Sequence, residues 1–321
     1  MNVSKPGVAL IGDIGATNIR FALVQPNGAI TPARVYALND HASLPDAIET
    51  YLAEASPAAR PLQAVLAVAS PVTGDQVTLT NHPWSFSVEG LRRQLGFRRL
   101  RVVNDFVANA AAIPHLGERD CLQIGGGAPV EGAPVGIIGP GTGLGVGAFV
   151  PTPNGPVHIA GEGGHVTMTP ASAQESAILD LMRKRYDHVS AERLLSGPGL
   201  VNLYNTLCEL AEIPAAPFTP AQIISPQIWT KDRRTREATA IFCAMLGTVA
   251  GNLALTLGAR GGIYIAGGIV PRLAQFFAQS EFRSRFEAKG RMRSYLAAIP
   301  TYLIVRPHPE LLGAAALLNE P

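Results

Sequence analysis

Residues 12–18 have the composition of a turn that binds phosphate, with an Asp-x-Gly-x-Thr pattern between two apolar runs. Glycine lets the backbone approach an anion closely, and successive backbone N–H groups together with a threonine hydroxyl can hold phosphate oxygens. Asp13 can hold Mg²⁺ through water, because this cation prefers oxygen ligands and keeps much of its hydration. An ordinary hairpin turn is the alternative interpretation. The residues predicted to form this site are Gly12, Asp13, Gly15, Ala16, Thr17 and Asn18.

Two further glycine segments could serve the same ligand. Residues 139–145, Gly-Pro-Gly-Thr-Gly-Leu-Gly, repeat the first device between apolar runs, and a glycine-rich sheet corner is the alternative. Gly267 and Gly268 follow the apolar run 262–266, and their lack of side chains would let a flat purine ring lie against the backbone. Glycines at such a turn often serve packing alone. The chain has no Gly-x-Gly-x-x-Gly pattern and no Gly-Lys pair, so the dinucleotide-binding fingerprint and the P-loop are absent. The residues predicted here are Gly141, Thr142, Gly143, Gly267 and Gly268.

Asp105 is a candidate for chemistry because of its place between two expected elements. Residues 101–104, Arg-Val-Val-Asn, are expected to form a strand, and residues 106–113 an alanine-rich helix. Asp105 therefore lies at the carboxyl end of a strand, which is the edge of an α/β sheet where ligands gather. The alternative is that Asp105 only caps its helix, since Asp is favoured at that position.

Helices and strands alternate along the whole chain, which predicts an α/β fold. Strands are expected at residues 8–11, 20–24, 64–69, 101–104, 262–266 and 301–305. Helices are expected at residues 44–55, 106–113, 172–186, 190–195, 200–211, 234–257 and 310–318, and from about 271. The proline-rich segment 213–226 is expected to be a loop.

The composition limits the classes of partner. With 321 residues the chain is long enough for about two domains. Its formal charge of +2, without a block of Lys or Arg, gives no case for nucleic acid. Residues 132–161 carry no charged side chain, but their glycines and prolines favour short soluble strands over a membrane span. Three cysteines without CxxC spacing and an N-terminus unlike a signal peptide lead us to expect a cytoplasmic protein without a zinc site.

The three glycine segments, in this order, resemble the phosphate-1, phosphate-2 and adenosine segments of the sugar kinase, Hsp70 and actin superfamily. Within that superfamily the chain is similar to bacterial glucokinases essentially from end to end. The segments that carry this closer resemblance are residues 104–106, 161–166, 190–193, 196–202 and 266–272.

The resemblance implies a two-domain actin-like ATPase fold of the ribonuclease H-like type, with a ligand cleft between the domains. The small α/β domain would comprise residues 1–105 with 301–321, and the large α/β domain residues 106–300. The activity implied is ATP-dependent phosphorylation of D-glucose at the 6-hydroxyl, which gives glucose 6-phosphate and ADP. ATP would be the co-substrate and Mg²⁺ the cofactor. A cytoplasmic homodimer that does not bind membranes or nucleic acid is also implied.

The resemblance also assigns roles to single residues. Asp105 matches the general base for the 6-hydroxyl, and Asn104 matches a residue that binds the same end of the sugar. Glu162, His165 and Glu192 match the ligands of the opposite hydroxyls. Carboxylates, an imidazole and an amide suit a ring of donor and acceptor hydroxyls. Without the resemblance, a packing role for His165 and an exposed charge at Glu192 would be the simpler interpretations.

One departure and two rival classes remain. The zinc-containing repressor, open-reading-frame and kinase family has a cysteine-rich motif after its histidine segment, and residues 166–169 contain no cysteine. Mg²⁺ is therefore the only metal expected. A sugar-sensing repressor would need a DNA-binding module, and only residues 1–7 precede the first strand. A filament-forming ATPase would not need Glu162, His165 and Glu192. A kinase for another hexose is the nearer alternative.

Overall fold

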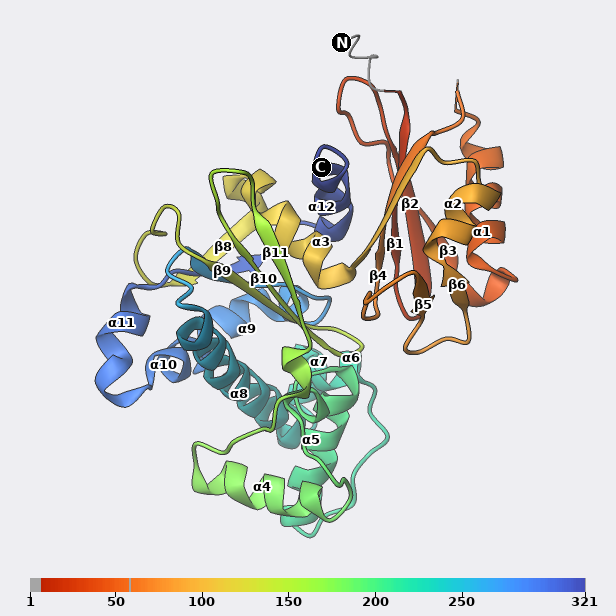
Figure 1. The fold of residues 1–321 in the computed structure, drawn as a ribbon. Helices are drawn as coiled ribbons and strands as arrows, with labels where there is room; N and C mark the ends of the chain where they lie inside the picture. Colours follow the sequence, from red (N-terminus) through yellow and green to blue (C-terminus); the bar gives the residue numbers. More distant parts are fainter. Residues whose placement is uncertain (1–6, 58, 321) are drawn as a thin grey trace. The chain divides into compact units, whose positions relative to one another are not determined.

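A computed structural model describes residues 7–57 and 59–320, and the chain divides into two compact units (Figure 1). The first unit comprises Met1–Gly117 and Arg306–Pro321, and the second comprises Glu118–Val305. Both boundaries differ from the predicted ones at residues 105/106 and 300/301. The difference has a packing reason, which involves one helix and one strand.

The helix α3 (Asp105–Ala112) belongs to the first unit because it packs closely on α12 (Pro309–Leu317). Gly313 makes this approach possible, since a side chain there would overlap the carbonyl oxygen of Ala108. The strand β13 (Thr301–Ile304) belongs to the second unit, because it pairs with one strand on each side there. The two compact units therefore differ from the division that the resemblance implies by one helix and one strand.

The first unit is built on a five-stranded sheet of order β3-β2-β1-β4-β7. Three consecutive strands form an antiparallel meander, and β4 and β7 run parallel to β1. Alternate residues enter two cores: Leu10 packs with the core that includes α1, and Ile11 packs with the core that includes α3 and α12. The elements are β1 (Ala9–Ile14), β2 (Asn18–Val24), β3 (Arg34–Ala37), β4 (Gln63–Val68), β7 (Arg99–Asn104), α1 (Leu44–Ala55) and α2 (Val88–Gln94), with a small hairpin of β5 (Gln76–Thr78) and β6 (Ser85–Ser87).

The second unit repeats this plan in a six-stranded sheet of order β11-β10-β9-β12-β13-β8. An antiparallel meander is again followed by strands parallel to its first member, β9. This repeated strand order confirms the predicted actin-like, ribonuclease H-like fold. The strands are β8 (Cys121–Gly125), β9 (Val135–Pro140), β10 (Leu144–Val150), β11 (Val157–Gly161) and β12 (Gly262–Ile265). The uncharged segment 132–161 therefore folds into the predicted strands.

The long helix α8 (Arg233–Leu257) forms the centre of the second unit's helical layer. Gly247 and Gly251 let α10 (Phe282–Glu287) approach it, because side chains there would overlap or crowd the carbonyl oxygens of Phe282 and Phe286. Within residues 7–57 and 59–320, α8 is the one helix long and apolar enough to cross a membrane. Its most apolar stretch is 61% buried inside the protein, and a core helix meets the same criterion.

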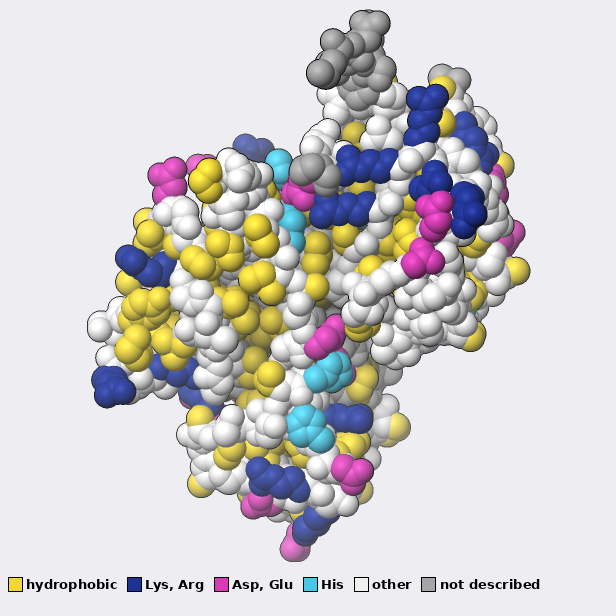
Figure 2. Space-filling model, in the orientation of Figure 1, with side chains coloured by type: hydrophobic (Ala, Val, Ile, Leu, Met, Phe, Trp, Pro, Cys, Tyr) yellow, Lys and Arg dark blue, Asp and Glu magenta, His cyan; other side chains and the backbone are white. Residues whose placement is uncertain are grey.

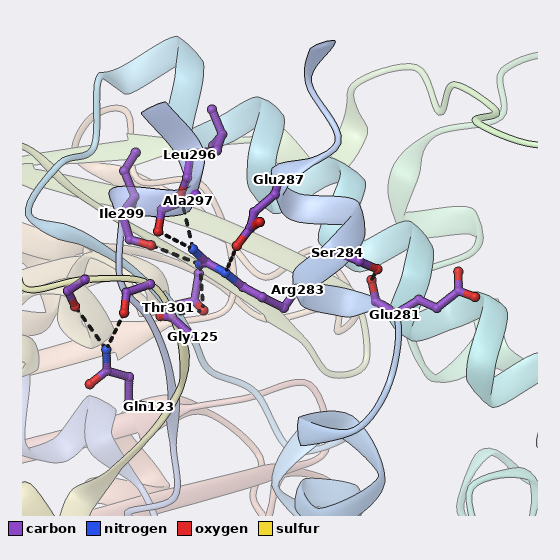
Figure 3. Close-up of polar contacts among 12 residues, drawn as sticks. Gln123, Gly125, Glu281, Arg283, Ser284, Glu287, Leu296, Ala297, Ile299 and Thr301 are labelled. Atoms are coloured by element: carbon purple, nitrogen blue, oxygen red, sulfur yellow. Dashed lines mark hydrogen bonds and ion pairs between the residues drawn. The ribbon is translucent and has the colours of Figure 1, made fainter. Parts of the chain in front are cut away.

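Arg283 on α10 joins several elements of the second unit (Figure 3). Its guanidinium donates to the carbonyl oxygens of Leu296, Ala297 and Ile299, at 3.2, 3.0 and 2.9 Å. These carbonyls end α11 (Arg293–Ala298), so one side chain satisfies acceptors that the helix itself leaves unpaired. Nε of Arg283 also donates to Glu287 at 2.7 Å. Arg283 therefore fixes α11 against α10.

The two edge strands of the second sheet leave apolar side chains exposed. Val157 and Ile159 on β11 are 54% and 39% exposed, and Leu122 on β8 is 42% exposed. Figure 2 shows hydrophobic side chains gathered over β8–β11 on the face of this unit that it presents. Edge strands keep unpaired backbone groups, so these are the parts of this sheet that are open to further pairing.

Several predicted helices differ in extent. The expected helix 190–195 is only the single 3₁₀ turn η5 (Ala191–Arg193), because Ser196 caps a new helix, α5 (Gly197–Leu210), and accepts the N–H of Gly199. The helix expected from about 271 begins as the 3₁₀ turn η6 (Val270–Leu273) before α9 (Ala274–Ala278). The expected loop 213–226 contains the short helix α6 and leads into α7. The remaining bounds are α4 (Ala173–Arg183), α6 (Pro220–Ile223) and α7 (Pro226–Trp229).

Candidate active site

The first glycine turn connects β1 to β2 and leaves backbone donors for a ligand. The N–H of Gly15 closes the turn on the carbonyl oxygen of Asn18 at 3.0 Å, and the N–H of Leu38 donates to the Thr17 carbonyl at 2.9 Å. Within the described residues, no acceptor is recorded for the N–H groups of Ala16 and Thr17. Two successive donors in one tight turn form the kind of concavity that holds a phosphate oxygen.

Asp13 lies just before this turn and is almost fully buried, with 6% of its surface exposed. It is directly opposite Arg20 in the β1–β2 register, and Arg20 Nη1 donates to its carboxylate at 2.8 Å. Burial, and then the negative charge of Glu310, hold the pKa of Asp13 well above its usual value, although Arg20 acts in the opposite direction. Asp13 is thus a carboxylate in a site that resists its ionisation, which a bound cation would reverse.

Gly12, one of the residues predicted to bind ATP, has a packing role in the sheet. It lies inside β1, and a side chain there would come within 2.9 Å of Phe21 and Leu66. Its small size therefore serves the packing of the sheet. The turn itself begins at Gly15, where an added Cβ would lie 3.2 Å from the Asn18 carbonyl oxygen.

Asn104 and Asp105 lie at the same edge of this sheet as the first turn. Ile14, Val68 and Asn104 are in register across β1, β4 and β7, so Asn104 is two strand spacings, about 10 Å, from the end of β1. Asn104 Oδ1 accepts the N–H of Phe106 at 2.9 Å and caps α3. Asp105 Oδ1 accepts the same N–H at 3.0 Å. The capping role considered for Asp105 is therefore shared between both side chains.

A loop partner orients Asn104. Its Nδ2 donates to the carbonyl oxygen of Ser70 at 3.3 Å, and the Ser70 hydroxyl accepts the N–H of Thr80 at 2.8 Å. The N–H of Ala69 donates to the Ile14 carbonyl at 3.1 Å. The loop after β4 is therefore tied both to the end of β1 and to the residue before Asp105.

The second glycine turn, between β9 and β10, is held by several distant segments. Gly141 donates its N–H to the carbonyl oxygen of Gly143 at 2.8 Å, and its own carbonyl accepts the N–H of Gly197 at the start of α5 at 2.8 Å. The N–H of Leu144 donates to Glu192 Oε2 at 2.9 Å. In the part of the chain that the structure describes, no acceptor is recorded for the N–H groups of Thr142 and Gly143. This turn thus presents two successive N–H donors, as the first turn does.

His165 ends a 3₁₀ turn, η4 (Gly163–His165), which packs against β10, and Glu162 directly precedes this turn. Gly164 allows this contact, since a side chain there would overlap the carbonyl oxygen of Leu144. Glu162 Oε2 is 3.9 Å from His165 Nε2, and both side chains are more than half exposed, at 58% and 60%. These exposed polar groups are accessible to a ligand.

The structure brings Glu192 to the same place. The segment after η4 pairs with the segment before η5: the N–H of Ala191 donates to the Val166 carbonyl at 2.9 Å, and Thr167 is bridged to Ser190. Glu192 is the middle residue of η5. Glu162, His165 and Glu192 therefore lie on segments that pack together beside the second turn, and their role as sugar ligands stays a prediction.

The Gly267–Gly268 segment meets this turn from β12. The N–H of Ala266 donates to the Ile138 carbonyl at 2.9 Å. Gly267 has a positive φ of 84°, and a side chain there would overlap the Pro140 carbonyl oxygen, so this glycine serves close backbone contact. Nothing lies within 4 Å of the position where Gly268 would carry a Cβ. Gly268 is thus the member of the pair beside open space.

The candidate residues consequently form two groups, one in each unit. The first contains Asp13, the first turn, Asn104 and Asp105, and the second contains the other turn with Glu162, His165, Glu192 and the Gly267–Gly268 segment. Among residues 7–57 and 59–320, no group of three or more His, Cys, Asp or Glu side chains could hold a metal ion. Asp13 alone still suits Mg²⁺, which proteins often hold through one carboxylate while nucleotide phosphates and water complete its shell.

Comparison with known proteins shows to which family this chain belongs. The family model described as Glucokinase matches residues 10–321. The chain is 48% identical over 315 residues to a glucokinase of Paramagnetospirillum magneticum, an alignment that covers 98% of both proteins. The chain belongs to the glucokinase family. This confirms the predicted resemblance.

Two solved structures agree with the family. A crystal structure of glucokinase from an Antarctic psychrotroph is similar, with a TM-score of 0.87 and 35% identity over 98% of this chain and 99% of that one. A glucokinase from Streptomyces griseus, in complex with glucose and AMPPNP, has a TM-score of 0.61 at 20% identity, over 97% and 99%. The second likeness, at 20% identity, shows a shared fold alone.

Sequence reasoning missed the groups that support the site. Arg20 was detectable, because Asp13 and Arg20 are equidistant from the turn of a predicted hairpin. Ser70 and the contact between Glu192 and Leu144 carry no local signal. The two ends of the latter contact are 48 residues apart.

Proposed function

We propose that this protein phosphorylates D-glucose at the 6-hydroxyl with ATP, giving glucose 6-phosphate and ADP. The observation that carries the proposal is the pair of glycine turns, each with two successive N–H donors that have no acceptor among residues 7–57 and 59–320. The first turn also has a carboxylate, Asp105, at its edge of the sheet. Membership of the glucokinase family supports it. The Streptomyces griseus relative, which was solved with glucose and AMPPNP, an ATP analogue, supports ATP as the donor.

In this proposal Asp105 is the general base. It takes the proton of the 6-hydroxyl as that oxygen bonds to the γ-phosphorus, and the bond from phosphorus to the β-phosphate oxygen breaks. The N–H groups of the two turns neutralise charge on the phosphate oxygens. Mg²⁺, when bound through water near Asp13, supplies further neutralisation of the phosphates.

The sugar and the nucleotide are assigned to separate groups. Asn104 is proposed to bind the reacting end of the sugar, and Glu162, His165 and Glu192 its opposite hydroxyls. The open space at Gly268 suits the adenine ring. Buried or oriented polar groups that match hydroxyls discriminate strongly against sugars that leave them unpaired.

The test is ATP consumption against a panel of glucose, mannose, fructose and N-acetylglucosamine, with the sugar phosphate identified. Glucose should be phosphorylated with the highest kcat/KM. If another sugar is preferred, the protein is a different hexose kinase. ATP hydrolysis that does not depend on sugar would favour the filament-type ATPase, and the absence of turnover with retained sugar binding would favour a repressor.

Two further expectations of the family resemblance remain proposals. A homodimer should be visible by sedimentation equilibrium. A cytoplasmic location is consistent with the free state of Cys121, Cys208 and Cys243.

A further inference from the structure

Glu192 uses its two carboxylate oxygens unequally. Oε2 accepts the N–H of Leu144 at 2.9 Å and occupies the space that a side chain at Gly143 would need. For Oε1, no hydrogen bond is recorded within residues 7–57 and 59–320. The carboxylate is thus both an anchor of the second glycine turn and an acceptor with one oxygen left for a ligand.

The anchored residue adjoins the proposed phosphate donors. Leu144 directly follows Thr142 and Gly143, whose N–H groups have no recorded acceptor in the described part of the chain. Fixing Leu144 fixes the direction of these two groups. The opposite side of the turn is fixed by the bond from Gly197 to Gly141 at 2.8 Å, so Glu192 supplies the second of two long-range anchors.

We propose that Glu192 positions the nucleotide turn through Oε2 while Oε1 accepts a sugar hydroxyl, so that sugar occupancy and nucleotide affinity are coupled through one carboxylate. This inference rests on the proposed function and adds a positioning role to a residue otherwise assigned to the sugar alone. A hydroxyl bound at Oε1 restricts the rotation of the carboxylate, and the restriction is shared by Leu144. Because such coupling is reciprocal, nucleotide should tighten sugar binding by the same factor.

The experiment compares Glu192→Ala and Glu192→Gln by calorimetric titration with Mg·ADP, without sugar and at saturating glucose. Without sugar, the Ala variant should bind Mg·ADP about tenfold more weakly, since its turn loses an anchor. The amide oxygen of Gln can still accept the Leu144 N–H, so the Gln variant should stay within about threefold of wild type. A purely sugar-binding Glu192 would leave Mg·ADP affinity without sugar unchanged in both variants.

Asp187→Ala is the matched control, because Asp187 is an exposed acid that precedes Glu192 in the sequence, and no contact between it and the turn is found among the described residues. It should leave Mg·ADP affinity unchanged, which separates the anchor from a general loss of negative charge. Unchanged Mg·ADP affinity in Glu192→Ala would overturn the inference. If that variant does not fold, a tenfold loss in Glu192→Gln without sugar would overturn it equally. Failure of the wild-type protein to phosphorylate glucose would instead overturn the proposed function.

Discussion

Each of the two glycine turns presents two successive backbone N–H donors, but different kinds of contact support the two turns. The first turn, residues 15–17, is flanked within its own hairpin by Asp13 and Arg20, which pair across β1 and β2 at 2.8 Å. The second turn, residues 141–143, is held from outside its hairpin by Gly197 and Glu192, with Gly164 and Gly267 packed against its flanks. The ion pair beside the first turn comes from its own hairpin, although Leu38 and Ala69 also donate to its ends, whereas the side-chain anchor of the second turn comes from a distant segment.

This difference indicates which kind of substitution each turn should tolerate least. The first unit concentrates charge at its sheet edge, since Asp105 and Glu310 both raise the pKa of the buried Asp13. The second unit concentrates close backbone contacts, because two glycines there approach carbonyl oxygens of the turn. We therefore expect charge substitutions to have the larger effect on activity around the first turn, and added side-chain volume to have the larger effect on structure around the second turn.

The largest effect should come from Asp105→Asn. Loss of the proposed base should lower kcat by about 10²–10⁴-fold, while glucose affinity changes little. The amide oxygen can still accept the Phe106 N–H that Asp105 Oδ1 accepts at 3.0 Å, so the start of α3 should be preserved. Steady-state kinetics with a glucose titration measure both quantities.

The control for this variant is Asp46→Asn, which removes an acid from the first turn of α1 at an exposed position. Its kcat should equal that of the wild type. A kcat above about a tenth of wild type in Asp105→Asn would show that Asp105 is not the base, and would remove the main functional contrast between the two units.

The second effect tests the packing of the second turn. Gly164→Ala should destabilise the protein by about 1–3 kcal/mol, because the new methyl group overlaps the Leu144 carbonyl oxygen and displaces the strand or the turn. Gly141→Ala meets nothing within 4 Å and should change stability by less than about 0.5 kcal/mol. Urea unfolding, with KM for ATP measured on the same samples, separates the two variants.

Arg283→Met provides the control for a loss of stability that is remote from the turn. It leaves three carbonyl acceptors at the end of α11 without their guanidinium partner and should cost about 1–3 kcal/mol. Its KM for ATP should stay at the wild-type value, whereas that of Gly164→Ala should rise. An equal rise in both variants would mean that the turn responds to stability in general, and the contrast between the units would fail.

The features that could be predicted from sequence are those that depend on local contacts, and the others depend on contacts between distant segments. The strand-turn-strand of residues 9–24, the position of Asp105 after a strand and the segment 132–161 were predictable, because periodicity and glycine placement act over a few residues. The placement of α3 and β13 was not, since it depends on Gly313 over Ala108 and on pairing between strands far apart in the chain. Glu162, His165 and Glu192 were assigned by family resemblance, and no local pattern links them.

The smallest effect concerns Asp13 and has an unusual sign. Because burial and the Glu310 charge raise its folded-state pKa, the folded protein holds the Asp13 proton more tightly than the unfolded chain does. The resulting stabilisation is complete below the unfolded pKa of about 3.9, and it is lost as the pH rises through the raised folded-state pKa. Above the unfolded pKa the buried Asp13 carboxyl therefore contributes less stability to the folded protein, and Asp13→Asn, which does not titrate, should unfold at a higher urea concentration than the wild type.

The free energy of unfolding is expected to rise by on the order of 1 kcal/mol at pH 8, which is typical of replacing a destabilising functional group. This gain should shrink as the pH falls toward 4. The amide oxygen can still accept from Arg20, which limits the loss of the 2.8 Å contact. The same variant should use Mg·ATP less well, because the carboxylate proposed to hold the hydrated cation is gone. If Asp13→Asn is less stable than the wild type at pH 8, the ion pair between Asp13 and Arg20 outweighs the cost of burying the carboxylate. Asp13 would then stabilise the first turn, as Glu192 stabilises the second.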